Sequence, residues 1–147
     1  MSFTIRTHID RPVAAVYDYL ADSTNTPSWY EAVHTASALD DGPPSIGKRY
    51  RLERRLPGID AVNIAEITEL EPDAVVTITS VEGPTPFRYR YVLAPEAAGR
   101  TLLQLEGKIS GEGLPGPAAV LAPLAERLFA NGMRANLANL KRILEND

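Results

Sequence analysis

Arg54 is the side chain whose position in the sequence most suggests chemistry. Residues 47–56 alternate with the period of a strand, which places Arg54 on the same face as Tyr50 and Leu52. A guanidinium buried on that apolar face without a partner costs several kcal/mol. Two interpretations are open: a salt bridge or a bulge relieves the charge, or Arg54 holds a carboxylate, phenolate or enolate of a guest. In both interpretations Asn63 is the expected cross-strand neighbour of Arg54.

Aromatic residues dominate one face of the strand expected at residues 86–94. Phe87, Tyr89 and Tyr91 alternate with polar or small residues, so their rings point to the same side of a sheet. These tyrosines either complete a core and send their hydroxyls to water or backbone groups, or form a cavity wall that orients a ligand. The expected hairpin register pairs Leu93 with Thr101, Tyr91 with Leu103, Tyr89 with Leu105 and Phe87 with Gly107.

Other catalytic chemistry has little support in this chain. Cysteine is absent, and the two histidines, His8 and His34, do not have the spacing of metal ligands. His8 falls on the polar face of its strand, and we expect His34 to be solvated. The segment GEGLPGP at 111–117 is a strand-to-helix turn and not a phosphate-binding loop. We therefore expect no metal and no cofactor, and the net charge of −4 argues against a nucleic-acid partner.

Hydrophobic periodicity and turn residues indicate the elements that position these side chains. Val13, Val16, Tyr17 and Leu20 have the spacing of a short amphipathic helix, and a second short helix is expected at 24–31. A helix from Pro117 to Leu144, roughly 40 Å long, can cross a whole sheet. The order of elements is typical of an α+β protein. Strands are expected at 2–10, 32–39, 47–56, 61–70, 74–82, 86–94 and 101–112.

Two residues of the expected helices bear on a binding site. Trp29, the only tryptophan, belongs to the second short helix and is either a core plug or a wall that contacts a guest. Gly132 lies near the middle of the long helix, where glycine costs about 1 kcal/mol relative to alanine. Gly132 is either tolerated there, breaks the helix, or removes a side chain where a ligand or the sheet comes close.

The order of several segments resembles a known family. These segments are IRTHIDRPVAAVYDYLAD, the tryptophan of TPSWYEAV, IGKRYRLERRLPG, AEITELEPDAVVTITS, FRYRYVLAP…GRTLLQLEG and LANLKRILE. Over nearly the whole chain they resemble the START-like (SRPBCC) superfamily, and more narrowly the bacterial polyketide cyclase/dehydrase and lipid-transport group. The resemblance implies a helix-grip (Bet v 1-like) fold. In that fold a curved antiparallel sheet of about seven strands surrounds a long C-terminal helix, with two short helices between the first two strands.

The resemblance also implies one START-like domain over residues 1–147, with a cavity between the sheet and the C-terminal helix. A lipid, a quinone or an aromatic polyketide-like compound would occupy this cavity. We expect the ligand to contact Trp29, Tyr50, Leu52, Arg54, Asn63, Ile67, Phe87, Tyr89, Tyr91, Leu103, Leu105, Leu124, Leu128 and Gly132.

Three functions are compatible with the sequence. The first is binding of a small hydrophobic molecule. The second is a cyclase, aromatase or dehydratase in which Arg54 anchors an anion and Tyr50 or Tyr89 acts as acid or base. The third is a protein-interaction module without a ligand. The sequence has no run of apolar residues long enough to cross a membrane and no signal-peptide pattern, so we expect a cytoplasmic protein, with a homodimer as a compatible assembly.

Overall fold

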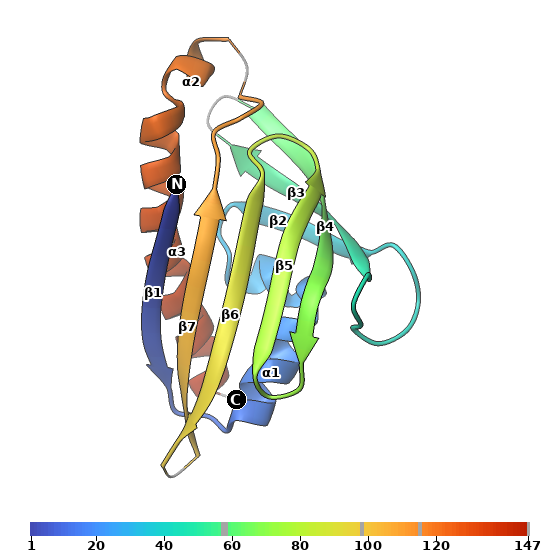
Figure 1. The fold of residues 1–147 in the computed structure, drawn as a ribbon, viewed down its shortest axis with the longest axis vertical. Coiled ribbons are helices and arrows are strands. Elements are labelled where there is room, and N and C mark those ends of the chain that lie inside the picture. The colour runs from blue at the N-terminus through green and yellow to red at the C-terminus, as the bar shows by residue number, and fades with distance from the viewer. Residues whose placement is uncertain (57–58, 98, 115, 147) are drawn as a thin grey trace.

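Seven antiparallel strands form one curved sheet in the computed structural model, which describes residues 1–56, 59–97, 99–114 and 116–146 (Figure 1). Consecutive strands from β2 to β7 are neighbours, and β1 pairs with β7. The predicted α+β class and helix-grip order are confirmed. Across the sheet the order is β1 (Ser2–Ile9), β7 (Arg100–Ile109), β6 (Phe87–Glu96), β5 (Val75–Glu82), β4 (Ile59–Glu71), β3 (Arg49–Leu56) and β2 (Val33–Ala38).

Helices cover the inner face of this sheet. Two short ones connect β1 to β2, namely α1 (Val13–Ala21) and the 3₁₀ helix η1 (Ser23–Ser28). The second was expected to span 24–31, but Trp29 lies just past its end. The long helix α3 (Ala122–Glu145) runs beside β1 and β7 (Figure 1). Within the described residues, no helix combines the length and apolar character needed to cross a membrane. The fully buried side chains of α3 are Met133, Leu137, Leu140 and Leu144.

The predicted helix from Pro117 to Leu144 is in fact two helices. A short helix, α2 (Pro117–Val120), ends before Leu121, and α3 begins directly after that residue. Pro123 lies in the first turn of α3, where its missing N–H leaves no hydrogen bond unmade, whereas inside a continuous helix it would remove one. Gly132 does not break α3, and a Cβ added there would meet no atom within 4 Å. The interpretation that Gly132 makes room for the sheet is therefore wrong.

The predicted strand faces are confirmed, and one register is corrected. Arg54 and the alternate residues of β3 and β4 point inward, while the residues between them are more exposed. The β6–β7 hairpin is shifted by two residues because the strands pair as far as Glu96 and Arg100, with Gly99 at φ +71° in the turn. An even shift leaves every side chain on its predicted face. The observed pairs are Leu93 with Leu103, Tyr91 with Leu105, Tyr89 with Gly107 and Phe87 with Ile109.

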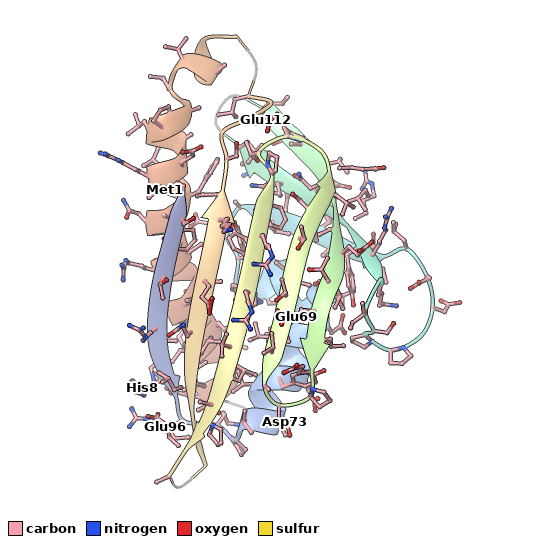
Figure 2. All side chains as sticks on the ribbon, viewed as in Figure 1. Met1, His8, Glu69, Asp73, Glu96 and Glu112 are labelled. Atoms are coloured by element: carbon pink, nitrogen blue, oxygen red, sulfur yellow. The ribbon has the colours of Figure 1, made fainter. Side chains whose placement is uncertain are left out.

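The outer face of the sheet carries ion pairs. Arg49 Nε lies 2.9 Å from Glu66 Oε1, so part of the run of basic residues at 48–55 is solvated surface. Arg90 bridges Glu69 at 2.8 Å and Glu106 at 3.1 Å, and Figure 2 labels Glu69 on this outer face. Exposed pairs of this kind contribute about 0–1 kcal/mol each. The outer face is thus ordinary charged surface, and the unusual polar residues lie on the inner face.

Candidate ligand-binding site

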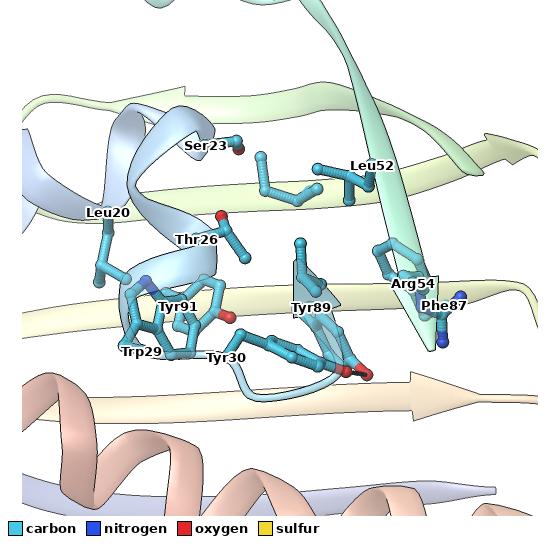
Figure 3. A pocket seen from close by; sticks show the side chains of 12 residues that line it. Leu20, Ser23, Thr26, Trp29, Tyr30, Leu52, Arg54, Phe87, Tyr89 and Tyr91 are labelled. Carbon is cyan, nitrogen blue, oxygen red and sulfur yellow. Dashed lines mark hydrogen bonds between the residues drawn. The ribbon is translucent and has the colours of Figure 1, made fainter. Parts of the chain in front are cut away.

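A cavity of about 30 Å³ lies between the α1–η1 segment and the inner face of β3, β5 and β6 (Figure 3). This inner cavity has room for only a few water molecules. Among the described residues none from α3 lines it, so it differs from the expected cavity between the sheet and the C-terminal helix. Its walls are Leu20, Ser23, Thr26, Trp29, Tyr30, Val33, Leu52, Arg54, Ile78, Phe87, Tyr89 and Tyr91.

Local hydrogen bonds bring Trp29 and Tyr30 over the cavity. Asp22 caps η1, because its Oδ1 accepts from the backbone N–H and the hydroxyl of Thr24. The helix ends as the N–H groups of Trp29 and Tyr30 both donate to the carbonyl of Thr26. The Trp29 ring then meets the Tyr91 ring edge-on at 6.3 Å. The residues after η1 therefore form the wall of the cavity that faces the sheet.

Arg54 is the most unusual wall residue. Its side chain is 3% exposed, and its Nη1 donates to Asn63 Oδ1 at 2.8 Å and, more weakly, to the Thr85 carbonyl at 3.5 Å. The guanidinium also lies over the Phe87 ring, 5.0 Å from its centre. Among the described residues no carboxylate lies within ion-pair distance of Arg54, although a salt bridge was one of the two interpretations. The charge is held by a neutral amide and a ring.

The backbone beyond Arg54 fixes the orientation of Asn63. Asn63 Nδ2 donates to the carbonyls of Glu82 and Pro84, at 3.3 and 2.8 Å, which leaves Asn63 Oδ1 free to face Arg54. The turn between these carbonyls needs Gly83, whose φ is +103° and where a Cβ would lie 2.4 Å from a carbonyl oxygen. Asn63 is a diagonal neighbour of Arg54, because β3 and β4 pair it directly with Leu52. The expected partnership is thus present in a different register.

Two of the cavity tyrosines, Tyr89 and Tyr91, remain protonated at neutral pH. Burial, followed by the effect of Tyr30, raises the pKa of Tyr89 well above its usual value. Burial also raises the pKa of Tyr91. The hydroxyls of Tyr30 and Tyr89 share a hydrogen bond of 3.1 Å. A neutral phenol can donate a hydrogen bond or a proton, but it cannot act as a base.

Tyr50 lies on the same strand face as Arg54 but does not line the cavity. It is fully buried, and its Oη has no hydrogen-bond partner among the described residues. Burial and then the Asp22 carboxylate raise the pKa of Tyr50 to about 12, against a smaller lowering effect of the Ser23 backbone. Tyr50 is therefore a neutral core residue behind the wall.

A second hollow, the outer groove, lies on the other side of Tyr30. It has a volume of about 300 Å³ and opens between the segment after η1 and α3. Among the described residues, Tyr30 alone lines both this groove and the inner cavity. The walls of the outer groove are Tyr30, Glu31, Ala32, Arg55, Leu128, Phe129, Gly132, Ala135 and Asn136.

The structure brings together some of the predicted site residues and separates others. Ile67, Leu103 and Leu105 are fully buried core residues, and α3 packs directly on the β7 side of the sheet, which carries Leu103 and Leu105. Leu124 is 53% exposed and lies outside both hollows, whereas Leu128 and Gly132 line the outer groove. The predicted residues that do line the inner cavity are Trp29, Leu52, Arg54, Phe87, Tyr89 and Tyr91.

Six wall residues were not predicted, and most come from the connection between β1 and β2. Sequence alternation cannot place them because this connection is not a strand. One signal was available: Tyr30 follows Trp29 directly, so an aromatic pair marks the segment. These six residues are Leu20, Ser23, Thr26, Tyr30, Val33 and Ile78.

Solved structures show the same fold. A START superfamily protein from Mycobacterium smegmatis is 18% identical, with a TM-score of 0.79 over 99% of this chain and 97% of that one. The Zhui aromatase/cyclase from Streptomyces sp. R1128 is 15% identical, with a TM-score of 0.74 over 99% and 92%. A major latex-like protein from Panax ginseng is 11% identical, with a TM-score of 0.65 over 97% and 95%. At these identities the likeness shows the fold alone.

A family model gives the assignment at the level of sequence. No curated protein matches the chain. Residues 1–145 match the family described as "Polyketide cyclase / dehydrase and lipid transport". This match covers nearly the whole chain and agrees with the helix-grip arrangement of its strands and helices. The chain belongs to the polyketide cyclase/dehydrase and lipid transport family.

Proposed function

We propose that the protein binds a small hydrophobic molecule with an anionic or strongly accepting oxygen, held at Arg54. One observation carries this proposal: a guanidinium that is 3% exposed lines a cavity and has no carboxylate partner among the described residues. Burying a cation in this way costs several kcal/mol of folding stability. An oxygen of a guest would satisfy the donors of Arg54 and offset that cost.

Aromatic surface defines the rest of the guest. Phe87 and Tyr89 are stacked with ring centres 5.1 Å apart, and Trp29 and Tyr91 add further rings to the wall. Flat rings of this kind favour planar guests, and the neutral hydroxyl of Tyr89 offers a hydrogen bond to an oxygen on the guest. An aromatic, quinone or polyketide-like molecule fits these walls better than a saturated acyl chain.

The volume of the inner cavity sets a condition on binding. Sites for drug-sized molecules have volumes of about 300–1,000 Å³, whereas the inner cavity has about 30 Å³. A guest must therefore displace wall side chains. The segment after η1 is the wall whose residues belong to no strand of the sheet, and its side chains are the ones that we expect a guest to displace.

A cyclase-type reaction in the same cavity is the second candidate, and the pairing of Arg54 with protonated tyrosines favours it. Arg54 would stabilise an enolate that forms as a reactive chain folds, and Tyr89 would donate a proton or a hydrogen bond. The raised pKa of Tyr89 keeps it protonated at neutral pH, so it is a hydrogen-bond donor and only a weak proton donor. If Arg54→Met leaves turnover of an identified substrate unchanged, Arg54 has no part in such a reaction.

Recovery of the guest tests the binding function. The protein should be purified without organic solvent and then extracted. Its extract is compared by mass spectrometry with the extract of the Arg54→Met variant, purified in the same way. We expect an aromatic compound with an acidic oxygen in the first extract and much less of it in the second. Absence of a co-purified compound, together with failure to bind N-phenylnaphthylamine, an uncharged aromatic probe, would rule out the binding function.

A further inference from the structure

Tyr30 is the partition between the inner cavity and the outer groove. Its ring is 8% exposed and lines both hollows, with the cavity on one side and α3 across the groove on the other. Figure 3 shows the ring reaching across the cavity so that its hydroxyl meets that of Tyr89. Removal of this one side chain from its position would place Arg54 and the outer groove in a single space.

Few polar interactions hold the Tyr30 ring, which is otherwise held by its burial in the core. Its only side-chain hydrogen bond within the described residues is the 3.1 Å bond to Tyr89 Oη. Its ring contacts Trp29 and Tyr89 at centre distances of 5.8 and 6.3 Å, both tilted and neither stacked. A hydrogen bond between neutral groups contributes only a modest net stabilisation. Burial of its apolar surface is therefore the main barrier to turning the ring outward, and an apolar guest that covers the same surface offsets that cost.

The backbone beside Tyr30 is held more firmly than the ring. Asn136, which is 5% exposed on α3, accepts from the Glu31 N–H at 3.1 Å. The Ala32 carbonyl accepts from the Arg55 N–H at 2.7 Å, which ties the segment to β3 as well. These contacts hold the backbone of the segment against α3 and β3, whereas the Tyr30 side chain has a single hydrogen bond. The moving part is thus a side chain and not the whole segment.

We propose that the inner cavity and the outer groove are two halves of one binding site, joined when Tyr30 turns outward, and that Tyr30 controls which guests reach Arg54. This inference rests on the proposed binding function. The joined site accepts an elongated guest whose anionic end meets Arg54 and whose apolar end lies against Leu128 and Phe129 on α3. Tyr30 closes behind a short guest and stays displaced by a long one.

Substitution of Tyr30 by phenylalanine tests the partition, because it removes the hydroxyl pair and keeps the ring. Tyr19→Phe is the matched control, since Tyr19 is a half-buried tyrosine that lines neither hollow. Binding of anilinonaphthalene sulfonate, an aromatic anion, is followed by stopped flow. We expect Tyr30→Phe to raise the association and dissociation rate constants together by about 2- to 10-fold, with Kd within 2-fold of wild type. Tyr19→Phe should change neither rate.

A ligand-free measurement separates the partition from the binding function. Trp29 is 5% exposed and lies against Tyr30, so acrylamide quenching of its fluorescence reports opening. We expect stronger quenching in Tyr30→Phe than in Tyr19→Phe. Unchanged quenching and unchanged rates in Tyr30→Phe would overturn the partition even if the probe binds. Stronger quenching without any probe binding to wild type would support the partition and contradict the binding function.

Discussion

Replacement of Arg54 by methionine distinguishes a structural cation from one kept for a guest. Removal of one partner of a buried ion pair costs about 3–5 kcal/mol. The variant instead loses a charge-assisted hydrogen bond to Asn63, worth about 1.5–3 kcal/mol, and the contact with Phe87, worth about 1–2 kcal/mol. The variant also no longer buries a cation, which stabilises its folded state by several kcal/mol and acts in the opposite direction. These contributions nearly cancel, so we expect the free energy of unfolding to change by about 1 kcal/mol or less.

Urea denaturation followed by Trp29 fluorescence measures this change. Arg51→Met is the matched control, because Arg51 lies on the same strand with its side chain 44% exposed on the outer face. We expect Arg51→Met to change the free energy of unfolding by about 0.5 kcal/mol or less. A loss of 3–5 kcal/mol in Arg54→Met alone would show that Arg54 is a structural cation, and the anion-binding role would be refuted.

The same variant tests the role of the charge in binding. Anilinonaphthalene sulfonate and N-phenylnaphthylamine have the same ring system, and only the first is an anion. Because a charge-assisted hydrogen bond is lost, we expect Arg54→Met to lower the affinity for the sulfonate by about 10- to 100-fold. The affinity for the uncharged probe should stay within 2-fold of wild type. Equal losses for both probes would contradict the assignment of Arg54 as an anion anchor.

Two further substitutions test residues outside the cavity wall. Tyr50→Phe removes a buried hydroxyl without a partner and should raise the free energy of unfolding by about 1 kcal/mol in urea titrations at neutral pH. The folded-state pKa of Tyr50, about 12, exceeds the unfolded value of 10.0, so its contribution is complete below pH 10 and is lost as pH rises toward 12. Tyr50→Phe should flatten that alkaline loss, and an unchanged slope would contradict the raised pKa. Gly132→Ala should stabilise by about 1 kcal/mol in the same titration, because a Cβ there meets nothing within 4 Å. Destabilisation would mean that α3 needs a glycine at this position.

Much of the fold could be predicted because strand alternation and turn residues are local signals. The inward face of β3 and β4 follows from period-two alternation, which also identified Arg54 as an inward cation. The register of β6 and β7 could not be predicted in the same way. A shift by two residues leaves every side chain on the same face, so only the geometry of the turn at Gly99 distinguishes the two pairings.

The site was less predictable than the sheet because it depends on tertiary packing. The sequence does not show that α3 covers the β7 side and fills the space over Leu103 and Leu105. Nor does it show that the segment after η1 turns Trp29 and Tyr30 toward β6. Among the described residues Arg54 has no ion-pair partner, and this too depends on distances in the tertiary structure that the sequence does not show. Residue types indicated the chemistry, and the fold decided which of those residues meet.

Trp29 fluorescence gives the most direct test of guest binding in the cavity. Trp29 is the only tryptophan and lines the inner cavity beside Tyr30. The compound extracted from the protein should be titrated back while Trp29 emission and, by equilibrium dialysis, the bound amount are recorded. We predict a saturable change in emission that follows binding at one site per chain. Binding by dialysis without any change in Trp29 emission would place the guest elsewhere and contradict the proposed site.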